Sequence, residues 1–231
     1  MSDVSPTLQS LYPFLHGERQ DQARQDEAAL RSIAAKCHDS LSVKERFFTE
    51  NARALLDTAR AIARVYANGG RMFAMGNGGS SCDAAHFAVE FQHPVTTGRP
   101  ALPAMNLVMD AAMITAVGND VGVEQLFARQ LEAHARAGDG LIGFSTSGNS
   151  ANLMAAFRRA RQLELITLGL CGGDGGNMAS SGLVEHCLVV PSNSIHRVQE
   201  SHVAAYHILW DVVHTLLADD RGCLVHKEQG A

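Results

Sequence analysis

The sequence predicts an α/β protein with a mainly parallel sheet of five strands, covered by helices on both faces. Five short apolar segments of strand length occur along the chain, and helical patterns separate nearly all of them. Such alternation is typical of parallel strands joined by crossover helices. The chain has 231 residues, which favours one such domain with additions at its ends over two domains.

The part of the chain before the first strand is expected to be an arm followed by helices. Residues 1–20 mix Pro, Ser, Gln and Gly without a sustained period, which predicts a flexible arm. Residues 21–40 have high helix propensity. A clearer, long helix is predicted from Val43, because apolar side chains recur at spacings of three and four as far as Tyr66, until the sequence NGG (68–70) ends it.

Five strands and further helices are predicted in the remainder of the domain, which we place at residues 21–218. The strands are expected at 71–77, 104–108, 165–170 and 186–190, together with one that ends at Ser145. The helices are expected at 80–91, from Asn152 to Phe157, and from about Val198 to Ala218. Residues 219–231 are polar and are expected to form a mobile tail.

Charge and cysteine content argue against several classes of function. The net charge is −5, and Lys and Arg are scattered, so the chain lacks the basic patch that nucleic acid or an anionic membrane would need. The N-terminus lacks the pattern of a signal peptide, and no apolar run has the length of a membrane span. The five cysteines form no CxxC pair and their number is odd, which favours a reduced, cytoplasmic compartment.

Two loops rich in glycine and serine follow predicted strands and run into predicted helices. They are "GNGGSS" (76–81) and "STSGNS" (145–150). Ligands of parallel sheets bind beyond the carboxyl ends of the strands, and the free N–H groups of a helix N-terminus favour an anion. Neither loop contains a lysine or the GxxxxGK[ST] pattern, so the sequence predicts a site for a phosphate monoester rather than a nucleotide-hydrolysing P-loop. One such loop alone could merely cap a helix; two make that interpretation weaker.

A second group of polar residues offers acid–base and metal chemistry. His86 and Glu90 are four residues apart on a predicted helix and therefore share a face. Gln199 and His207 lie eight residues apart on the last helix, which corresponds to a rise of about 12 Å. They would bind the same metal only if both side chains reach towards each other, or if Gln199 lies at a frayed helix start. These four residues make a nitrogen and oxygen set that suits Zn²⁺, although each alone could be an ordinary hydrogen-bonded helix residue.

Five motifs in register carry a resemblance to a known family. They are "GNGGSSCDAAHFAVEF", "GND" (118–120), "STSGNSAN", "GGDGG" (172–176) and "RVQESHVAAYHIL". From about residue 25 to 218 the chain resembles the sugar isomerase (SIS) domain of the phosphoheptose isomerases, also called sedoheptulose-7-phosphate isomerases. The resemblance implies a flavodoxin-like three-layer α/β/α sandwich and a homotetramer with active sites at subunit interfaces. It also implies a phosphosugar substrate, sedoheptulose 7-phosphate, and its conversion to D-glycero-D-manno-heptose 7-phosphate.

The resemblance also implies roles for individual residues. Phosphate would be bound by Ser80, Ser145, Thr146, Ser147 and Ser150. The sugar would be contacted by Asn77, Gly78, Gly79, Glu90, Asn119, Asp120 and Gln199. One zinc ion per subunit would be held by His86, Glu90, Gln199 and His207. Glu90 and His207 are also the implied proton carriers, which fits an isomerisation through an enediol because that reaction needs a base and an acid. A carboxylate bound tightly to zinc is a weaker base, so the two roles of Glu90 compete.

Three departures from the family pattern leave alternatives open. His196 stands where an Asp is usual, Pro94 lies near a usual Arg, and Gly173 replaces a usual Lys. Such losses of charge around a polyol phosphate would permit an isomerase of another ketose phosphate. A different class of function is a SIS protein without catalysis, either a phosphosugar sensor or an adaptor of the kind that binds the bacterial replication initiator. The four candidate zinc ligands favour the enzyme, since an adaptor has no need of them.

Overall fold

The computed structural model describes residues 21–219. The expected arm at 1–20 lies outside the described residues, as does the expected tail after Asp219. The chain divides into two compact units between Asp39 and Ser40. The described part of the first unit is helical, and its apolar side chains Leu30 and Ile33 are exposed. The second unit contains the sheet and all the candidate site residues.

Helix α2 (Gln22–Ala67) unites the two helical segments that the sequence predicts separately. The junction near Ser40 contains no glycine or proline that would end a helix, so the backbone hydrogen bonds continue through it. The helix ends as predicted, just before Gly69, which adopts a positive φ of 77°. The second half of α2 is amphipathic and buries Phe47, Ile62 and other apolar side chains.

The five predicted strands form one sheet in which every neighbouring pair is parallel. The order is β2-β1-β3-β4-β5, which is the flavodoxin-like arrangement. The strands are β1 (Met72–Gly76), β2 (Ala104–Asn106), β3 (Gly140–Ser145), β4 (Ile166–Gly172) and β5 (His186–Val190). Each lies within two residues of its predicted position, and the predicted fold class is confirmed. Strands β1 and β3 are buried along their whole length, which explains why their sequences are continuously apolar rather than alternating.

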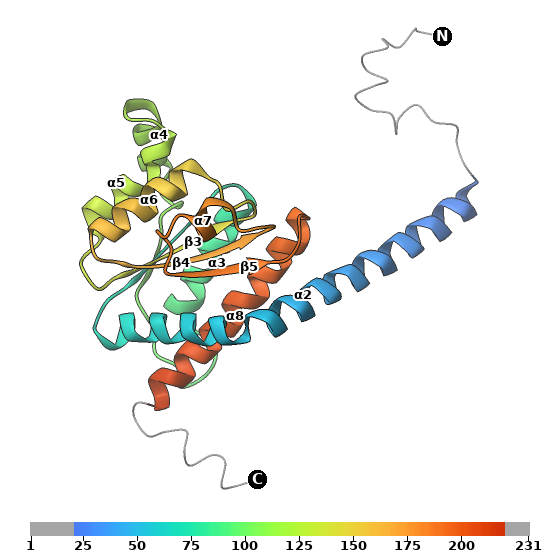
Figure 1. Cartoon of the computed structure of the whole chain (residues 1–231), viewed down its shortest axis with the longest axis horizontal. Coiled ribbons are helices and arrows are strands. Elements are labelled where there is room, and N and C mark those ends of the chain that lie inside the picture. The colour runs from blue at the N-terminus through green and yellow to red at the C-terminus, as the bar shows by residue number, and fades with distance from the viewer. Residues whose placement is uncertain (1–20, 220–231) are drawn as a thin grey trace. The chain divides into compact units, whose positions relative to one another are not determined.

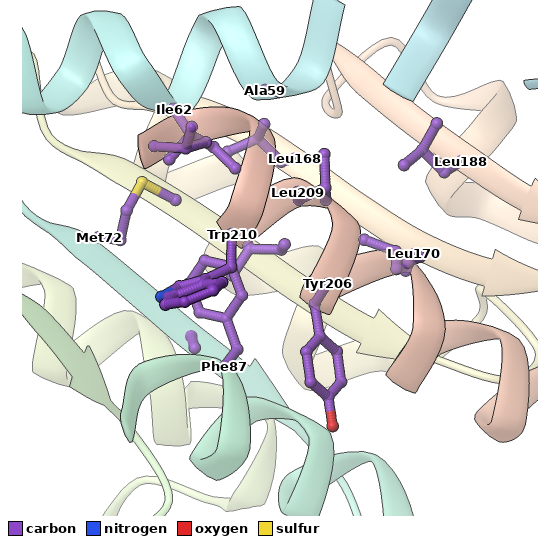
Figure 2. Close-up of a cluster of buried hydrophobic side chains, with 14 of the residues drawn as sticks. Ala59, Ile62, Met72, Phe87, Leu168, Leu170, Leu188, Tyr206, Leu209 and Trp210 are labelled. Atoms are coloured by element: carbon purple, nitrogen blue, oxygen red, sulfur yellow. The ribbon is translucent and has the colours of Figure 1, made fainter. Parts of the chain in front are cut away.

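Helices cover both faces of the sheet (Figure 1). On one face, α2 from Ser40 onward, α3 (Gly79–Gln92) and α8 (Ile195–Asp219) bury a cluster that includes Ile62, Phe87 and Leu209 (Figure 2). On the other face, α5 (Leu126–His134) and α6 (Ala151–Gln162) bury Phe127 and Phe157. The remaining helices are α4 (Ala111–Asp120), the short 3-10 helix η2 (Val123–Gln125) and α7 (Gly176–Ser180). None of the helices between residues 21 and 219 has both the length and the apolar character that crossing a bilayer would require.

Candidate functional site

The loop after β1 forms a tight turn into α3. A Cβ atom at Gly76 would lie 2.2 Å from the carbonyl oxygen of Ser80, so only glycine fits where the strand ends. The backbone N–H of Ser80 donates to the carbonyl of Asn77 at 3.0 Å, and Gly78 caps the helix with a positive φ of 52°. Ser80 is buried, whereas the backbone of Gly78 and Gly79 is exposed at the carboxyl end of the sheet. The turn thus leaves Gly78 and Gly79 exposed at the N-terminus of α3, where an anion can approach the backbone.

The loop after β3 is shaped by its first serine. Ser145 is buried, and its Oγ accepts a hydrogen bond from the backbone N–H of Gly148 at 3.1 Å. The same Oγ lies 3.3 Å from the Oγ of Ser150, the residue that precedes α6. Ser147 is exposed and Thr146 is partly exposed. The Oγ of Ser147 accepts from the backbone N–H of Asn149 at 3.3 Å, but its own proton can still be donated to a ligand at the exposed edge of the loop.

The two loops are joined by a pair of asparagines. Each side-chain amide of Asn77 and Asn152 donates to the carbonyl oxygen of the other, both at 2.9 Å. Asn152 was given no role by the sequence, although it belongs to the quoted motif "STSGNSAN". Its partner becomes evident only when β1 and β3 are known to be neighbours in the sheet. This pairing brings the two predicted phosphate loops together at the point where the strand order reverses.

Three of the four predicted zinc ligands meet between α3 and α8. One potential ligand atom from each of His86, Glu90 and His207 lies within 4.8 Å of the others. The Nε2 of His86 is 3.0 Å from Oε1 of Glu90, and the Nε2 of His207 is 4.0 Å from the same oxygen. The side chains of the two histidines are 43% and 42% exposed, so the cluster is open to a ligand. Two imidazole nitrogens and one carboxylate oxygen form a donor set that fits Zn²⁺.

The fourth predicted ligand, Gln199, contacts the loop after β1. A Cβ atom at Gly79 would lie 2.2 Å from Nε2 of Gln199, so the missing side chain of Gly79 makes room for this amide. Gln199 lies near the start of α8 and is partly buried. The contact accounts for the position of Gly79 in the motif and brings Gln199 to the first turn of the helix that carries His86 and Glu90.

The hydroxyl of Tyr206 lies 2.7 Å from Nδ1 of His86, a contact that sequence reasoning did not find. The ring of Tyr206 is buried with its centroid 5.9 Å from that of Phe144, and its hydroxyl lies at the edge of the cluster in Figure 2. Burial, and then the nearby carboxylates of Asp83 and Glu90, raises the pKa of the Tyr206 phenol above its ordinary value, so the proton stays on the oxygen. A hydroxyl can donate to Nδ1 or accept from it, and Tyr206 therefore suits either tautomer of His86. Tyr206 was assigned no role from the sequence, although it belongs to the quoted motif "RVQESHVAAYHIL".

Two more contacts connect the same pair of helices. The indole N–H of Trp210 donates to the backbone carbonyl of Glu90 at 2.8 Å. About two turns earlier on each helix, His202 lies fully buried with Nδ1 3.8 Å from Oδ2 of Asp83, which is also buried. Within residues 21–219, neither ring nitrogen of His202 has a hydrogen-bond partner. Asp83, His86 and Glu90 thus each face a residue of α8.

The predicted sugar contacts Asn119 and Asp120 belong to neither of the two loops nor to helices α3 and α8. They end helix α4, are exposed, and are hydrogen-bonded to each other at 2.7 Å. Among the described residues, no hydrogen bond or ion pair joins either side chain to the two loops or to the histidine cluster. Their predicted role stays untested.

The three departures from the family pattern fall around the site in different ways. His196 is exposed in the first turn of α8, and Pro94 lies in the segment between α3 and β2. Gly173 has a φ of 66°, and a Cβ atom there would lie 3.1 Å from Oδ1 of Asn193. A lysine at this position would therefore be strained, which gives a physical reason for glycine.

A cavity of about 830 Å³ opens at the carboxyl end of the sheet. The residues that follow β3, β4 and β5 line it, among them Thr146, Ser147 and Asp174. Arg46 lines the same cavity from α2. Sequence reasoning missed Arg46, because α2 is remote from the loops in the chain.

Comparisons with known proteins agree with this geometry. The family model described as "SIS domain" matches residues 37–172, more than half of the chain. A phosphoheptose isomerase from Desulfovibrio desulfuricans is 44% identical over 185 residues, which cover 80% of this chain and 87% of that protein. One from Trichlorobacter lovleyi is 42% identical over 181 residues, covering 78% of this chain and 91% of the relative.

Solved structures give the same relationship. A phosphoheptose isomerase from Francisella tularensis superposes with a TM-score of 0.77 at 34% identity, covering 81% of this chain and 98% of that one. The phosphoheptose isomerase from Neisseria gonorrhoeae gives a TM-score of 0.76 at 33% identity, covering 81% and 99%. The parallel sheet, the paired Gly/Ser loops and the histidine cluster thus occur in a chain similar to these enzymes over nearly their whole length, and the chain belongs to the SIS-domain phosphoheptose isomerase family.

Proposed function

We propose that the chain is a phosphosugar aldose–ketose isomerase that converts sedoheptulose 7-phosphate to D-glycero-D-manno-heptose 7-phosphate. The observation that carries this proposal is the cluster of His86, Glu90 and His207, which gathers a carboxylate and two imidazoles within 4.8 Å of one another. His86 and Glu90 lie on α3, the helix that begins at the loop after β1, and His207 lies on α8. Acid–base groups close to a phosphate-binding loop are what an isomerisation of a sugar phosphate requires.

The phosphate group is expected at the paired loops. The hydroxyls of Thr146, which is partly exposed, and Ser147, which is exposed, supply donors there together with the N-termini of α3 and α6. Ser145, Ser150 and Ser80 complete the proposed set. In this arrangement Ser145 acts chiefly by shaping the loop, because its hydroxyl accepts from Gly148.

The proton transfer is assigned to Glu90 and His207. Glu90 removes a proton from C1 of the ketose, and the carbonyl oxygen at C2 gains a proton to give an enediol. The proton returned to C2 and the loss of the hydroxyl proton at C1 then leave an aldehyde at C1. His207 lies beside Glu90 and is the proposed second carrier, which moves the protons between the two oxygens. Asn77, Gly78 and Gly79 are proposed to orient the sugar above the loop.

A zinc ion is proposed to be held by His86, Glu90, His207 and Gln199. When bound, it would supply a Lewis acid that stabilises negative charge on the sugar oxygens. Tyr206 would orient the imidazole of His86 through the 2.7 Å contact at Nδ1, as outer partners of ligating histidines do.

A homotetramer with interfacial sites is part of the proposal. An apolar groove of about 280 Å³ runs between α2 and α8, lined by Phe48, Leu55 and Val212 among others, and Ile208 beside them is 41% exposed. A second copy of the chain would cover this surface. In such an assembly, Asn119 and Asp120 are proposed to contact the sugar at the site of a neighbouring subunit.

The test is an assay of the purified protein with sedoheptulose 7-phosphate, with metal analysis of the same sample. Proton exchange with solvent at C1 or C2, together with about one zinc per chain, is the expected result. A zinc-loaded protein that exchanges no proton with any seven-, six- or five-carbon ketose phosphate would exclude the isomerase and favour a sensor or adaptor.

A further inference from the structure

We propose that Arg46 is a phosphate-binding residue of the site, a role that rests on the proposed function. The starting point is the cavity of about 830 Å³ beyond β3, β4 and β5. Thr146 and Ser147, two of the proposed phosphate ligands, line it, and so does Arg46 from α2. Arg46 is the residue with a positive charge among those that line this cavity.

The loops alone leave the charge of a phosphate uncompensated. Residues 145–150 carry hydroxyls, an amide and backbone N–H groups but no cation, and the hydroxyl of Ser145 is already engaged. Asp174 adds a negative charge to the same cavity, and its Oδ1 accepts a hydrogen bond from the N–H of Gly176. A phosphate dianion beside this carboxylate needs a cation, and an arginine fork is the side chain that binds phosphate most directly.

The ion pair between Arg46 and Glu50 leaves Arg46 able to bind phosphate. Its Nε donates to Oε1 of Glu50 at 2.9 Å, and the two side chains are 61% and 53% exposed. An exposed pair of this kind contributes little to stability and is screened by salt. The terminal nitrogens Nη1 and Nη2 have no partner within the described residues, so Arg46 can keep its bond to Glu50 while both terminal nitrogens bind phosphate.

The backbone of Arg46 is held firmly. The next residue, Phe47, is fully buried in the core. One and a half turns earlier, Ser40 donates to Oε2 of Glu200 on α8 at 2.6 Å. Packing on both sides of Arg46 therefore fixes the segment of α2 that carries it beside the cavity.

Arg53 provides a matched control for the experiment. It lies two turns further along α2, and its Nε bonds to Oδ2 of Asp57 four residues on at 3.1 Å, as Arg46 bonds to Glu50. Arg53 does not line the cavity. Replacing either arginine by glutamine thus removes the same charge and the same type of exposed pair, and only Arg46→Gln removes a cation from the cavity.

The test compares wild type, Arg46→Gln, Arg46→Lys and Arg53→Gln by calorimetry with inorganic phosphate and by kinetics with sedoheptulose 7-phosphate. Loss of a charged hydrogen bond should raise the Kd for inorganic phosphate roughly ten-fold or more in Arg46→Gln. The KM for the sugar phosphate should rise similarly with little change in kcat, since the phosphate does not react. Arg46→Lys should recover part of the affinity, and Arg53→Gln should match the wild type.

The two proposals fail in different ways. Equal phosphate affinity in Arg46→Gln and Arg53→Gln, with both folded as judged by thermal unfolding, would overturn the role of Arg46 while the isomerase stands. A wild type that binds no measurable phosphate would overturn it as well. A wild type that turns over no ketose phosphate, but loses phosphate affinity in Arg46→Gln alone, would reject the isomerase and support Arg46.

Discussion

Helices α3 and α8 position their candidate functional groups through side chains that reach from one helix to the other, whereas the loops after β1 and β3 depend on glycine backbone conformations. On the helix side, Tyr206 contacts the ring of His86, and Trp210 donates to the carbonyl of Glu90. On the loop side, Gly148 has a φ of 66° and bonds to Ser145 within the turn. The two regions belong to the same candidate site, but side chains position the groups on the helices and the backbone shapes the loops.

This difference separates chemistry from binding. A side chain on α3 can be exchanged for one of equal shape, which removes a reactive group and leaves the fold intact. A change in the loops moves backbone donors, so it alters binding and stability together. We therefore expect substitutions between the helices to affect turnover or metal retention, and substitutions in the loops to affect affinity for the phosphate.

The largest effect is expected from Glu90→Gln. The amide keeps the shape of the side chain but cannot act as the base, so turnover should fall by roughly 10²–10⁴. Affinity for sedoheptulose 7-phosphate should stay near normal, because the loops are untouched. Solvent deuterium exchange at C1 and C2, measured with zinc content on the same samples, checks this. Zinc content that falls together with activity would instead assign Glu90 chiefly to the metal.

Gly148→Ala should have the next largest effect. A Cβ atom there would lie 2.1 Å from the carbonyl oxygen of Gly175, in a backbone conformation that favours glycine. We expect the free energy of unfolding to fall by about 2–4 kcal/mol and phosphosugar affinity to be lost with it. Gly182→Ala is the control, since Gly182 has a φ of 72° and open space around its Cα. Urea unfolding that gives the same loss for both variants would show that strain alone matters and that the loop contact does not.

Tyr206→Phe tests whether the contact between α3 and α8 at His86 supports zinc binding. Loss of the hydroxyl at Nδ1 of His86 should weaken zinc binding roughly 10–100-fold, as removal of outer partners of ligating histidines does. Competition with a chelator measures this without reference to activity. Tyr66→Phe is the matched control, because Tyr66 is buried and its hydroxyl has no partner among the described residues. Zinc retention that is unchanged in Tyr206→Phe would exclude the orienting role.

The smallest effect is expected from single serines of the loop. Ser147→Ala should weaken phosphosugar binding roughly ten-fold, since one hydrogen bond to a charged oxygen is lost. Ser145→Ala should do the same and also reduce stability, because the N–H of Gly148 loses the Oγ of Ser145 and keeps only the backbone carbonyl of that residue as an acceptor. Calorimetry and thermal unfolding of both variants separate the two contributions. Unchanged affinity in both would move the phosphate away from this loop.

Much of the fold could be predicted because each element has a local signal. The strands are short apolar runs between helical patterns, and β5 matches its prediction residue for residue. The loops at 76–81 and 145–150 can be recognised by their high content of glycine and serine. The continuity of α2 through Ser40 was missed, because helix propensity alone does not say whether two adjacent segments join.

Sequence reasoning grouped candidate site residues where they share a motif, and it missed contacts that form only in space. His86 and Glu90 are four residues apart, so helical geometry alone puts them on one face. The contacts of Asn152, Tyr206 and Arg46 at the candidate site depend on strand order and on the packing of α8 and α2, which no short stretch of sequence encodes.

The contact of Gly148 with the next loop has a consequence for transplanting this site. The carbonyl of Gly148 accepts from the N–H of Met178, and Oδ1 of Asn149 accepts from the N–H of Asn177. These hydrogen bonds join the turns after β3 and β4, so the conformation of each turn depends on the other. A chimera that exchanges residues 145–150 alone should lose the phosphate loop, whereas one that exchanges 145–150 and 172–178 as a pair should keep it. A redesign of substrate specificity on this fold should therefore exchange the two loops together rather than one alone.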